Sequence, residues 1–409
     1  MTFKKVVALC LEIIILGILV GLVISLYQFL MDKIIDISNE IFASSNYILL
    51  TICLVLAILL SFVIIYFNQK YKGYLGSGLP QYEAYYDNKL DFSSAKMFIF
   101  VLIDSFYAYF CGYVLGGEGP SITLASSMAK MTTKDKEVIA ACGSAGFSVA
   151  FLAPLAGFFH LIEENRDFLR PSFLLKGFFI ILIASTVGYF VFPHNLLPYL
   201  VDSFLDYKYY YLIVIVTIMA FIVGRLYVLA LVKVKDLSLG FKYFLYLTPI
   251  FTLIFLYFKT KDLNFIGSGS TILNDPLFTT SISLAVFYLV YRLLGTAFSN
   301  SLAVSGGLVM PMLTLGAICG LITTLCFKKV VPDINKYTNI LVVIGMVVLY
   351  NSVCKTPLTA LALSFKMGKI NYIILPVLIG LILSTGLVFL TRRENIYKLL
   401  EKRIINHAK

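Results

Sequence analysis

Long runs of apolar residues, separated by short polar turns, dominate this chain and predict membrane-spanning helices. A helix needs about 20 mainly apolar residues to cross a bilayer. The segments that approach or exceed this length are Phe3–Met31, Tyr47–Phe67, Met97–Leu115, Leu174–Phe192, Tyr209–Val232, Phe244–Phe258, Ile282–Leu302, Ile340–Val353 and Tyr372–Leu390. The pattern therefore predicts an all-α integral membrane protein.

Other apolar segments are shorter or contain a proline that should cut them. They are Ile122–Met131, Ser144–Ile162 with Pro154, and Leu308–Phe327 with Pro311. Short helices can lie at membrane depth only where surrounding protein satisfies their backbone ends. We therefore expect these segments to be half-helices buried inside the protein.

Short glycine and proline motifs occur twice, in the same order. The first two pairs differ by 191 residue numbers and the third by 203. They are Gly76-Ser77-Gly78 with Gly267-Ser268-Gly269, Pro120-Ser-Ile-Thr-Leu-Ala with Pro311-Met-Leu-Thr-Leu-Gly, and, more loosely, Pro154-Leu-Ala-Gly with Pro357-Leu-Thr-Ala. Paired interruptions of this kind are typical of broken helices that face a central binding site.

The repeat predicts one transmembrane domain over residues 1–409. Its first half covers about residues 1–205 and its second half about 206–391. A short amphipathic helix over about 392–409, with Ile396, Leu399, Leu400 and Ile404 on its apolar face, closes the chain.

Composition supports a membrane location and explains the charge. Hydrophobic residues make up 60% of the chain and charged residues 13%, which leaves too little polar surface for a soluble protein of this length. The net charge is +11. Basic residues near the span ends follow the positive-inside rule, so the charge indicates topology and not a nucleic-acid partner. They are Lys4, Lys5, Lys70, Lys72 and the tail from Arg392 to Lys409.

Cysteine and histidine show no metal-binding or disulfide pattern. The 7 cysteines lie scattered in apolar stretches without a CxxC motif. His160, His194 and His407 are isolated. We therefore expect no disulfide framework, no metal and no organic cofactor.

Gly76-Ser-Gly-Leu-Pro80 is a candidate anion site. Its glycines let backbone N–H groups approach a ligand, and a proline can start a helix, whose N-terminus attracts anions. Ser77 adds a hydroxyl donor without a full charge that would hold a small anion too tightly. An ordinary tight turn at the membrane boundary remains the alternative.

Glu118 lies at membrane depth within Gly116-Gly-Glu-Gly-Pro120, between two apolar runs. An ionisable residue at that depth is costly and indicates function. A carboxylate at a helix start can occupy the same N–H groups that would bind an anion, and protonation would release it. The alternative is an acid that caps a helix in an interfacial loop.

Further candidates lie at the end of one apolar segment and the start of another. Glu163 and Glu164 end the segment that begins at Gly143, where a solvated helix end is the alternative interpretation. Ser305-Gly-Gly-Leu-Val-Met-Pro311 opens the second-half counterpart of the Glu118 segment, with a packing kink as its alternative. Tyr397 lies among charged residues near the C-terminus, where an interfacial tyrosine is the alternative interpretation.

Together these motifs resemble the CLC family of chloride channels and chloride/proton exchangers. Gly76-Ser-Gly-Leu-Pro80 is similar to the family's GSGIP, and Gly116-Gly-Glu-Gly-Pro120 to its G(K/R)EGP. Gly306-Gly-Leu-Val-Met-Pro311 is similar to GGxFxP, and the segment from Pro154 to Glu164 to PLAG…EE. With Tyr397, the match covers nearly the whole chain.

The resemblance implies two inverted halves whose broken half-helices meet at a central anion site, in a homodimer with one pore in each subunit. It implies that Glu118 is the gating glutamate and Glu164 the internal proton glutamate. The residues implied in chloride binding are Ser77, Tyr397 and the backbone N–H groups of Leu308 and Val309. Those of Gly117, Glu118, Gly119 and Met310 would lie near an outer site.

Two residues depart from the family pattern. Gly117 stands where a basic residue usually precedes the gating glutamate, which removes a positive charge near the outer mouth. Val309 stands where phenylalanine is usual, although its backbone N–H is retained. The Gly-Ser-Gly motif favours chloride over fluoride, because the fluoride-selective branch usually departs from GSGIP.

The resemblance implies a chloride/proton antiporter of prokaryotic type, without C-terminal regulatory modules and without enzymatic activity. A passive chloride channel on the same fold is the alternative, and Glu164 favours exchange. An intramembrane enzyme with Glu118 and Ser77 would lack a histidine or lysine partner. The expected partners of the antiporter are chloride, protons and the lipid bilayer. The Lys-, Ile- and Tyr-rich composition without tryptophan favours a bacterial inner membrane.

Overall fold

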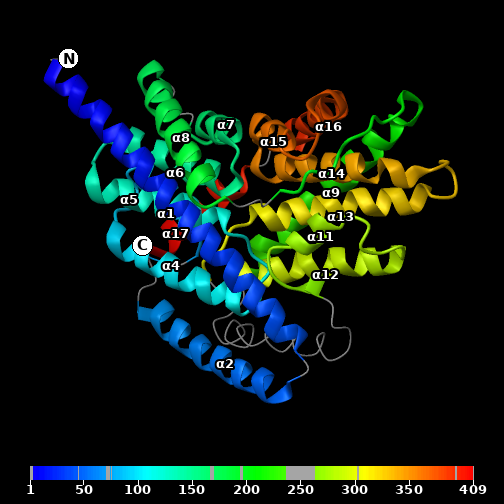
Figure 1. The fold of residues 1–409 in the computed structure, drawn as a ribbon, viewed down its shortest axis with the longest axis horizontal. Coiled ribbons are helices and arrows are strands. Elements are labelled where there is room, and N and C mark those ends of the chain that lie inside the picture. Colours follow the sequence, from blue (N-terminus) through cyan, green and yellow to red (C-terminus); the bar gives the residue numbers. More distant parts are fainter. Residues whose placement is uncertain are drawn as a thin grey trace.

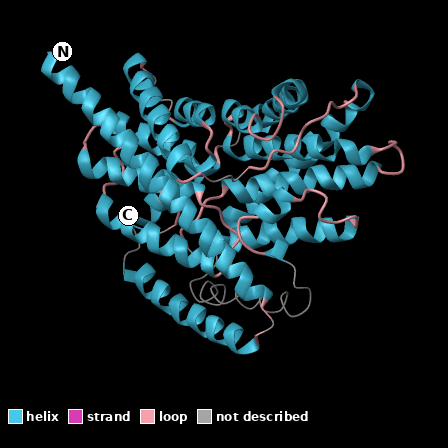
Figure 2. Ribbon diagram, viewed as in Figure 1, coloured by secondary structure: helices cyan, strands magenta, loops and turns pink. Residues whose placement is uncertain are grey.

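The computed structural model describes the chain as a helical assembly (Figures 1 and 2). It describes residues 3–44, 46–70, 74, 76–165, 170–193, 197–235, 263–301, 304–391 and 394–408. Within these ranges there are helices, turns and two isolated backbone bridges, but no strand. Among the predicted features, Phe244–Phe258, His194, Lys72, Arg392, Arg393 and Lys409 lie outside the described residues.

The first half is built of eight described helices that pack around α5 and α6. They are α1 (Phe3–Ala43), α2 (Tyr47–Lys70), α3 (Leu79–Tyr86), α4 (Ser94–Phe110), α5 (Glu118–Thr132), α6 (Lys136–Phe151), α7 (Pro154–Glu164) and α8 (Pro171–Val191).

The second half packs around α13 and α14. Its helices are α9 (Tyr211–Lys235), α11 (Ser270–Asn274), α12 (Ile282–Ser301), α13 (Val309–Phe327), α14 (Thr338–Cys354), α15 (Pro357–Ser364), α16 (Ile370–Thr391) and α17 (Ile396–Ala408). Single 3₁₀ turns at Tyr207–Tyr209, Leu263–Phe265 and Ile334–Tyr337 precede α9, α11 and α14.

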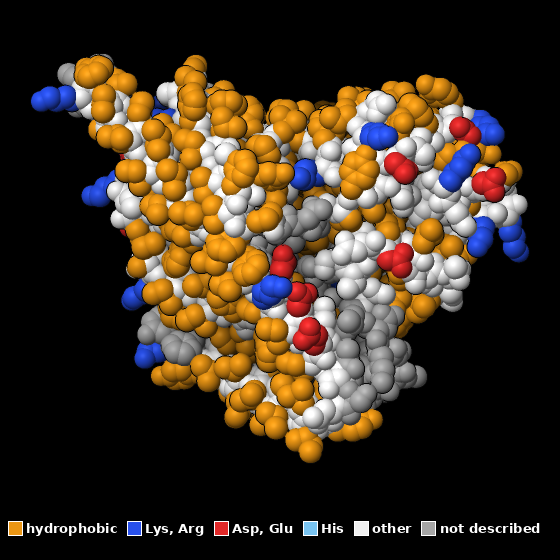
Figure 3. All heavy atoms as spheres, in the orientation of Figure 1, with side chains coloured by type: hydrophobic (Ala, Val, Ile, Leu, Met, Phe, Trp, Pro, Cys, Tyr) orange, Lys and Arg blue, Asp and Glu red, His pale blue; other side chains and the backbone are white. Residues whose placement is uncertain are grey.

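The protein is a multi-pass membrane protein. In the described part of the chain, 8 helices are long and apolar enough to span a bilayer. Apolar side chains cover most of the visible surface, with charged ones gathered in a few places (Figure 3). The outer helices expose large apolar side chains, and Phe190 on α8 is 77% exposed. In contrast, 94% of the span window in α13 is buried.

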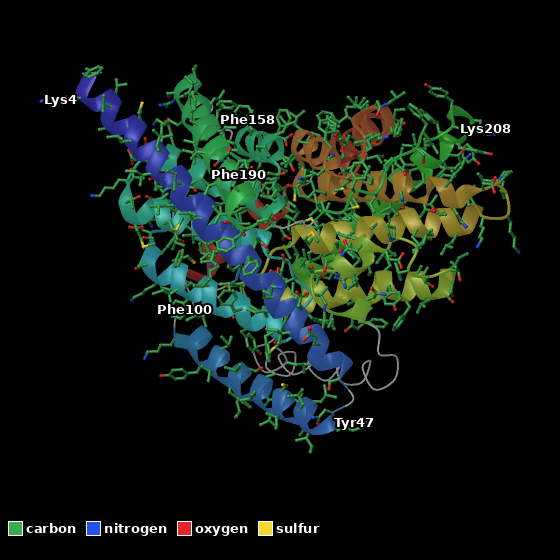
Figure 4. All side chains as sticks on the ribbon, viewed as in Figure 1. Lys4, Tyr47, Phe100, Phe158, Phe190 and Lys208 are labelled. Atoms are coloured by element: carbon green, nitrogen blue, oxygen red, sulfur yellow. The ribbon has the colours of Figure 1, made fainter. Side chains whose placement is uncertain are left out.

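Two predicted boundaries are wrong. α1 does not end at Met31 but continues to Ala43, and it crosses the molecule obliquely from Lys4 to the region of Tyr47 (Figure 4). Its polar last turns remain helical, with an ion pair of 3.7 Å between Lys33 and Asp36. Pro311 does not cut α13, because it is the third residue of that helix. A proline in the first turn removes no intrahelical hydrogen bond.

The predicted break at Pro154 is confirmed, and the same break occurs in the second half. α6 ends in a left-handed residue, Leu152, with φ of 47°, and α7 starts at Pro154. α14 likewise ends in Lys355, with φ of 62°, and α15 starts at Pro357. Pro357 follows Pro154 by 203 residues, and Lys355 follows Leu152 by the same number.

Side-chain contacts also repeat between the halves. The Thr123 hydroxyl donates to the Ser77 carbonyl oxygen at 2.5 Å, and the Thr314 hydroxyl donates to that of Ser268 at 3.1 Å. In each half, a threonine on the central half-helix thus holds the serine of a Gly-Ser-Gly loop. Gly78 and Gly269 end these loops with φ of 76° and 95°, a conformation that glycine adopts without strain.

The packing of α13 against α14 depends on glycine. A Cβ atom at Gly316 would lie 2.6 Å from the Met346 Cα atom, and one at Gly320 would lie 2.5 Å from the Leu341 carbonyl oxygen. These neighbours are backbone atoms, which cannot move aside as a side chain could. The glycines therefore allow the two helix backbones to touch, as small residues do in membrane proteins.

We expect Gly316→Val to destabilise the protein by roughly 3 kcal/mol, because overpacking here would push two helix backbones apart. Thermal unfolding in detergent, followed by size-exclusion chromatography, measures the effect. Gly386→Val on α16 is the matched control, since nothing lies within 4 Å of a Cβ atom there. Equal melting temperatures for the two variants would contradict the packing argument.

Candidate functional site

The two halves meet at Gly116 and Gly307, the residues just before α5 and α13. Their backbones form an antiparallel bridge. The Gly116 N–H donates to the Gly307 carbonyl oxygen at 2.8 Å, and the Gly307 N–H donates in return to that of Gly116. The bridge brings the N-termini of two half-helices to one place. Because both ends carry unpaired N–H groups and positive partial charge, the junction can stabilise an anion.

Glu118 places its carboxylate at this junction. The side chain is fully buried. A Cβ atom on Gly116 or Gly307 would overlap the carboxylate oxygens, which shows how closely both backbones approach it. The N–H groups of Glu118 and Met310 interact with the carboxylate, but neither oxygen has a hydrogen-bond partner of regular geometry in the described part of the chain. Glu118 thus places an ionisable group at this anion-stabilising junction.

Ser77 lies beside the junction. A Cβ atom on Gly119 would be 3.2 Å from the Ser77 Cβ atom and 3.0 Å from the Gly307 Cα atom. The Gly-Ser-Gly loop, the first turn of α5 and the loop before α13 therefore converge. Ser77 is half-buried, and the Thr123 hydroxyl fixes its backbone.

The first turn of α13 faces the same region. Leu308 is the N-cap of α13, and Val309 and Met310 are its first residues. Their N–H groups precede the first hydrogen bond of the helix, in which the Met312 N–H donates to the Leu308 carbonyl oxygen. All three side chains are buried. The structure thus collects Leu308, Val309 and Met310 with Glu118 and Ser77.

Gly117 is enclosed by polar side chains from other helices. A Cβ atom there would lie 3.1 Å from both amide atoms of Gln28 on α1 and 3.2 Å from the Tyr109 hydroxyl. The Gln28 amide donates to the Ser121 hydroxyl at 2.8 Å, and that hydroxyl donates to the Gly117 carbonyl oxygen at 2.9 Å. Gln28 thus fills the space that a side chain at position 117 would need.

Tyr397 comes from the far end of the chain. It lies in the first turn of α17, which packs against α3, the helix that follows Ser77. The Tyr397 ring is buried, with 9% of its surface exposed, and its hydroxyl interacts with the Cys354 thiol. On the predicted apolar face of α17, Ile396 and Leu400 are buried and Leu399 is half-buried, while the Ile404 side chain lies outside the described residues.

Glu164 ends α7 on the side of a small internal cavity. The Asn395 amide donates to both of its carboxylate oxygens at 3.3 Å. The Asn395 side-chain oxygen accepts from the Tyr397 N–H at 3.0 Å. Both Glu164 and Tyr397 line the cavity. Glu164 is therefore not a freely solvated helix end but is held beside Tyr397.

Asp104 on α4 lies at the candidate site, and the motifs did not identify it. Its carboxylate accepts the Ser305 N–H at 2.6 Å, and the Ser305 hydroxyl donates to the Gly76 carbonyl oxygen at 2.7 Å. Asp104 is buried and its other oxygen has no partner among the described residues. It ties the loop before α13 to the Gly-Ser-Gly loop. An acid inside the apolar run Met97–Leu115 was the available signal.

Asp104→Ala should loosen the junction. It leaves the buried Ser305 N–H without an acceptor, which costs about 1–3 kcal/mol, and we expect a lower melting temperature with weaker anion binding. Calorimetric titration with chloride measures the binding. Asp104→Asn keeps an acceptor oxygen and should bind much as the unaltered protein does. An alanine variant equal to the unaltered protein in both measurements would remove Asp104 from the site.

Comparison with known proteins identifies the family. The sequence profile of the voltage-gated chloride channel family matches residues 60–388. The H⁺/Cl⁻ exchange transporter ClcA of Vibrio vulnificus (strain YJ016) is 26% identical over 328 residues, which cover 74% of this chain and 69% of that protein. The chain belongs to the CLC family.

Solved structures show the same fold. A slow cyanobacterial Cl⁻/H⁺ antiporter superposes with a TM-score of 0.83 at 20% identity, over 97% of this chain and 98% of that one. A CLC-type fluoride/proton antiporter superposes with a TM-score of 0.71 at 16% identity, over 94% of this chain and 97% of that one. The predicted architecture of inverted halves with broken half-helices is confirmed.

Proposed function

We propose that the protein exchanges chloride for protons across the membrane. The observation that carries this proposal is the Glu118 carboxylate, buried where the N-termini of α5 and α13 converge. The junction of α5 and α13, which can stabilise an anion, is thus occupied by the titratable carboxylate of Glu118. Chloride and a proton then control the same group, which is a sufficient basis for coupling.

Chloride would bind next to this junction without meeting a full positive charge. The Ser77 and Tyr397 hydroxyls and the N–H groups of Leu308 and Val309 would hold the central ion. The N–H groups of Gly117, Glu118, Gly119 and Met310 would hold the outer ion or the Glu118 carboxylate. Neutral donors stabilise the ion while still allowing it to leave. These chloride ions are the ligands we assign to the site.

Protons would enter on the side of Glu164. Its carboxylate is half-buried and shares a cavity with Tyr397, so it can pick up a proton outside the chloride path. Protonated Glu118 would leave the junction, and chloride would take its place. An uncoupled chloride channel needs no second acid, so the held position of Glu164 supports exchange.

The identity of the anion and the assembly are also proposals. The names of relatives include chloride and fluoride exchangers, and the retained Gly-Ser-Gly loop supports chloride. We propose a homodimer in a bacterial inner membrane, with a complete pore in each subunit, since each chain alone supplies both half-helix N-termini.

The test is a flux assay on purified protein in liposomes under controlled voltage. An imposed chloride gradient should drive protons against their own gradient, followed as a change in external pH. Chloride flux without proton movement would identify a channel, and equal flux of fluoride would correct the anion. Flux of neither ion would overturn the proposal.

A further inference from the structure

One internal cavity lies between Glu164 and the helix that carries Glu118. Its volume is about 30 Å³ for the centres of water molecules, which is room for two or three waters, since each needs roughly 10–15 Å³. Glu164 at the end of α7, the next residue Asn165, and Ile122 on α5 line it. Because Ile122 is four residues after Glu118, the cavity ends about one helical turn from the gating glutamate.

His160 lines this cavity, and the proposed exchange does not yet use it. It lies four residues before Glu164, so both side chains project from the same face of α7, roughly 6 Å apart at Cβ. The imidazole is buried, with 8% of its surface exposed. Its Nδ1 atom shares a hydrogen bond of 3.1 Å with the Ser144 hydroxyl, and its ring stacks on Phe147 at 4.5 Å.

These contacts fix the ring and leave one nitrogen available. In the described part of the chain, Nε2 has no direct hydrogen-bond partner. The titratable groups that share the cavity are Glu83, Tyr82 and Tyr86 from α3, Glu164 from α7 and Tyr397 from α17. Ser126 from α5 and Ser144 from α6 complete its polar lining. Two acids, Glu83 and Glu164, thus line the cavity together with the imidazole, and its lining includes no Lys or Arg side chain.

We propose that His160 carries protons from Glu164 toward Glu118, a role that rests on the proposed chloride/proton exchange. The Glu164 carboxyl gives its proton to the imidazole through a cavity water. One nitrogen gains an N–H bond, and the ring becomes an imidazolium while Glu164 becomes a carboxylate. The imidazolium then releases one proton through water near Ile122 to the Glu118 carboxylate. The imidazole returns to neutrality, and one proton has moved.

Histidine suits this role because one ring nitrogen can accept a proton while the other donates one. A titratable ring between the two glutamates divides one long transfer into two short ones. An aromatic ring without nitrogens would pack equally well on Phe147 but could not carry a proton.

The test is His160→Phe in liposomes, with proton and chloride fluxes measured on the same preparation. Phenylalanine keeps the stacked ring, so we expect unchanged chloride affinity and a proton flux lower by at least about tenfold, given that positioned acid–base groups contribute 10²–10⁴-fold. In His160→Ala, added 4-methylimidazole should restore proton flux.

The possible outcomes distinguish a proton-carrying role of His160 from a packing role. If the unaltered protein moves chloride but no protons, the exchange and the carrier fall together. If the unaltered protein is coupled and His160→Phe is coupled equally, only the carrier role is overturned. A parallel loss of chloride binding and proton flux would make His160 a packing residue. Should the phenylalanine variant not fold, His160→Gln removes the titration with a polar side chain and is judged by the same comparison.

Discussion

Glu118→Gln is expected to abolish proton transport and to leave an ungated chloride flux. Glutamine has nearly the same shape but cannot take up or release a proton at this position. Proton flux should fall to background, at least about 100-fold below that of the unaltered protein, within the range contributed by acid–base groups. Paired chloride and pH electrodes on liposome suspensions measure both fluxes together.

The substitution also removes the negative charge that competes with chloride for the N–H groups of α5 and α13. Chloride flux in the variant should therefore lose its dependence on pH. Gln28→Met is a useful comparison, because Gln28 contacts the same turn of α5 without carrying a charge. Proton coupling that survives in Glu118→Gln would contradict the proposed mechanism.

Glu164→Gln is expected to reduce proton flux by about tenfold or more while chloride flux continues, since loss of a positioned acid–base group has effects of this size. Glutamine keeps the contact to Asn395, so the fold around Tyr397 should persist. The chloride path does not pass through this side chain, and chloride affinity should therefore be unchanged. Flux of both ions and calorimetric titration of chloride check these expectations.

Glu163 provides the matched control at the neighbouring position. Its carboxylate accepts the Leu358 and Thr359 N–H groups at 2.8 Å and so caps the start of α15. Glu163→Gln should lower the melting temperature, because loss of a cap costs about 1 kcal/mol, while proton coupling stays within about twofold. Equal loss of coupling in both variants would mean that α7 tolerates no change here and that Glu164 has no special role.

The fold was predictable because its repeat consists of residues that shape the backbone. Glycine and proline mark the loop ends and helix starts in both halves, and the structure places Gly78 with Gly269 and Pro154 with Pro357 in matching positions. The helix ends were less predictable. The polar end of α1 looked like a loop, and Pro311 looked like a break although it belongs to a first turn.

The site was predictable where function and backbone geometry share a motif. Glu118, Ser77 and the start of α13 lie in such motifs. Asp104, Gln28 and His160 do not, because single side chains in apolar helices show no partner in the sequence. Their positions near the candidate site come from contacts between distant segments, such as Asp104 with Ser305. Tyr397 was likewise identified only through the family resemblance, since its position depends on how α17 packs against α3.

The central claim is that chloride and the Glu118 carboxylate compete for one set of N–H groups. Calorimetric titration of chloride into the purified protein, at pH 5 and pH 8 and with Glu118→Gln beside the unaltered protein, tests it directly. The account predicts tighter chloride binding at the lower pH for the unaltered protein, and tight binding independent of pH for the variant. The same pH dependence in both proteins would contradict it.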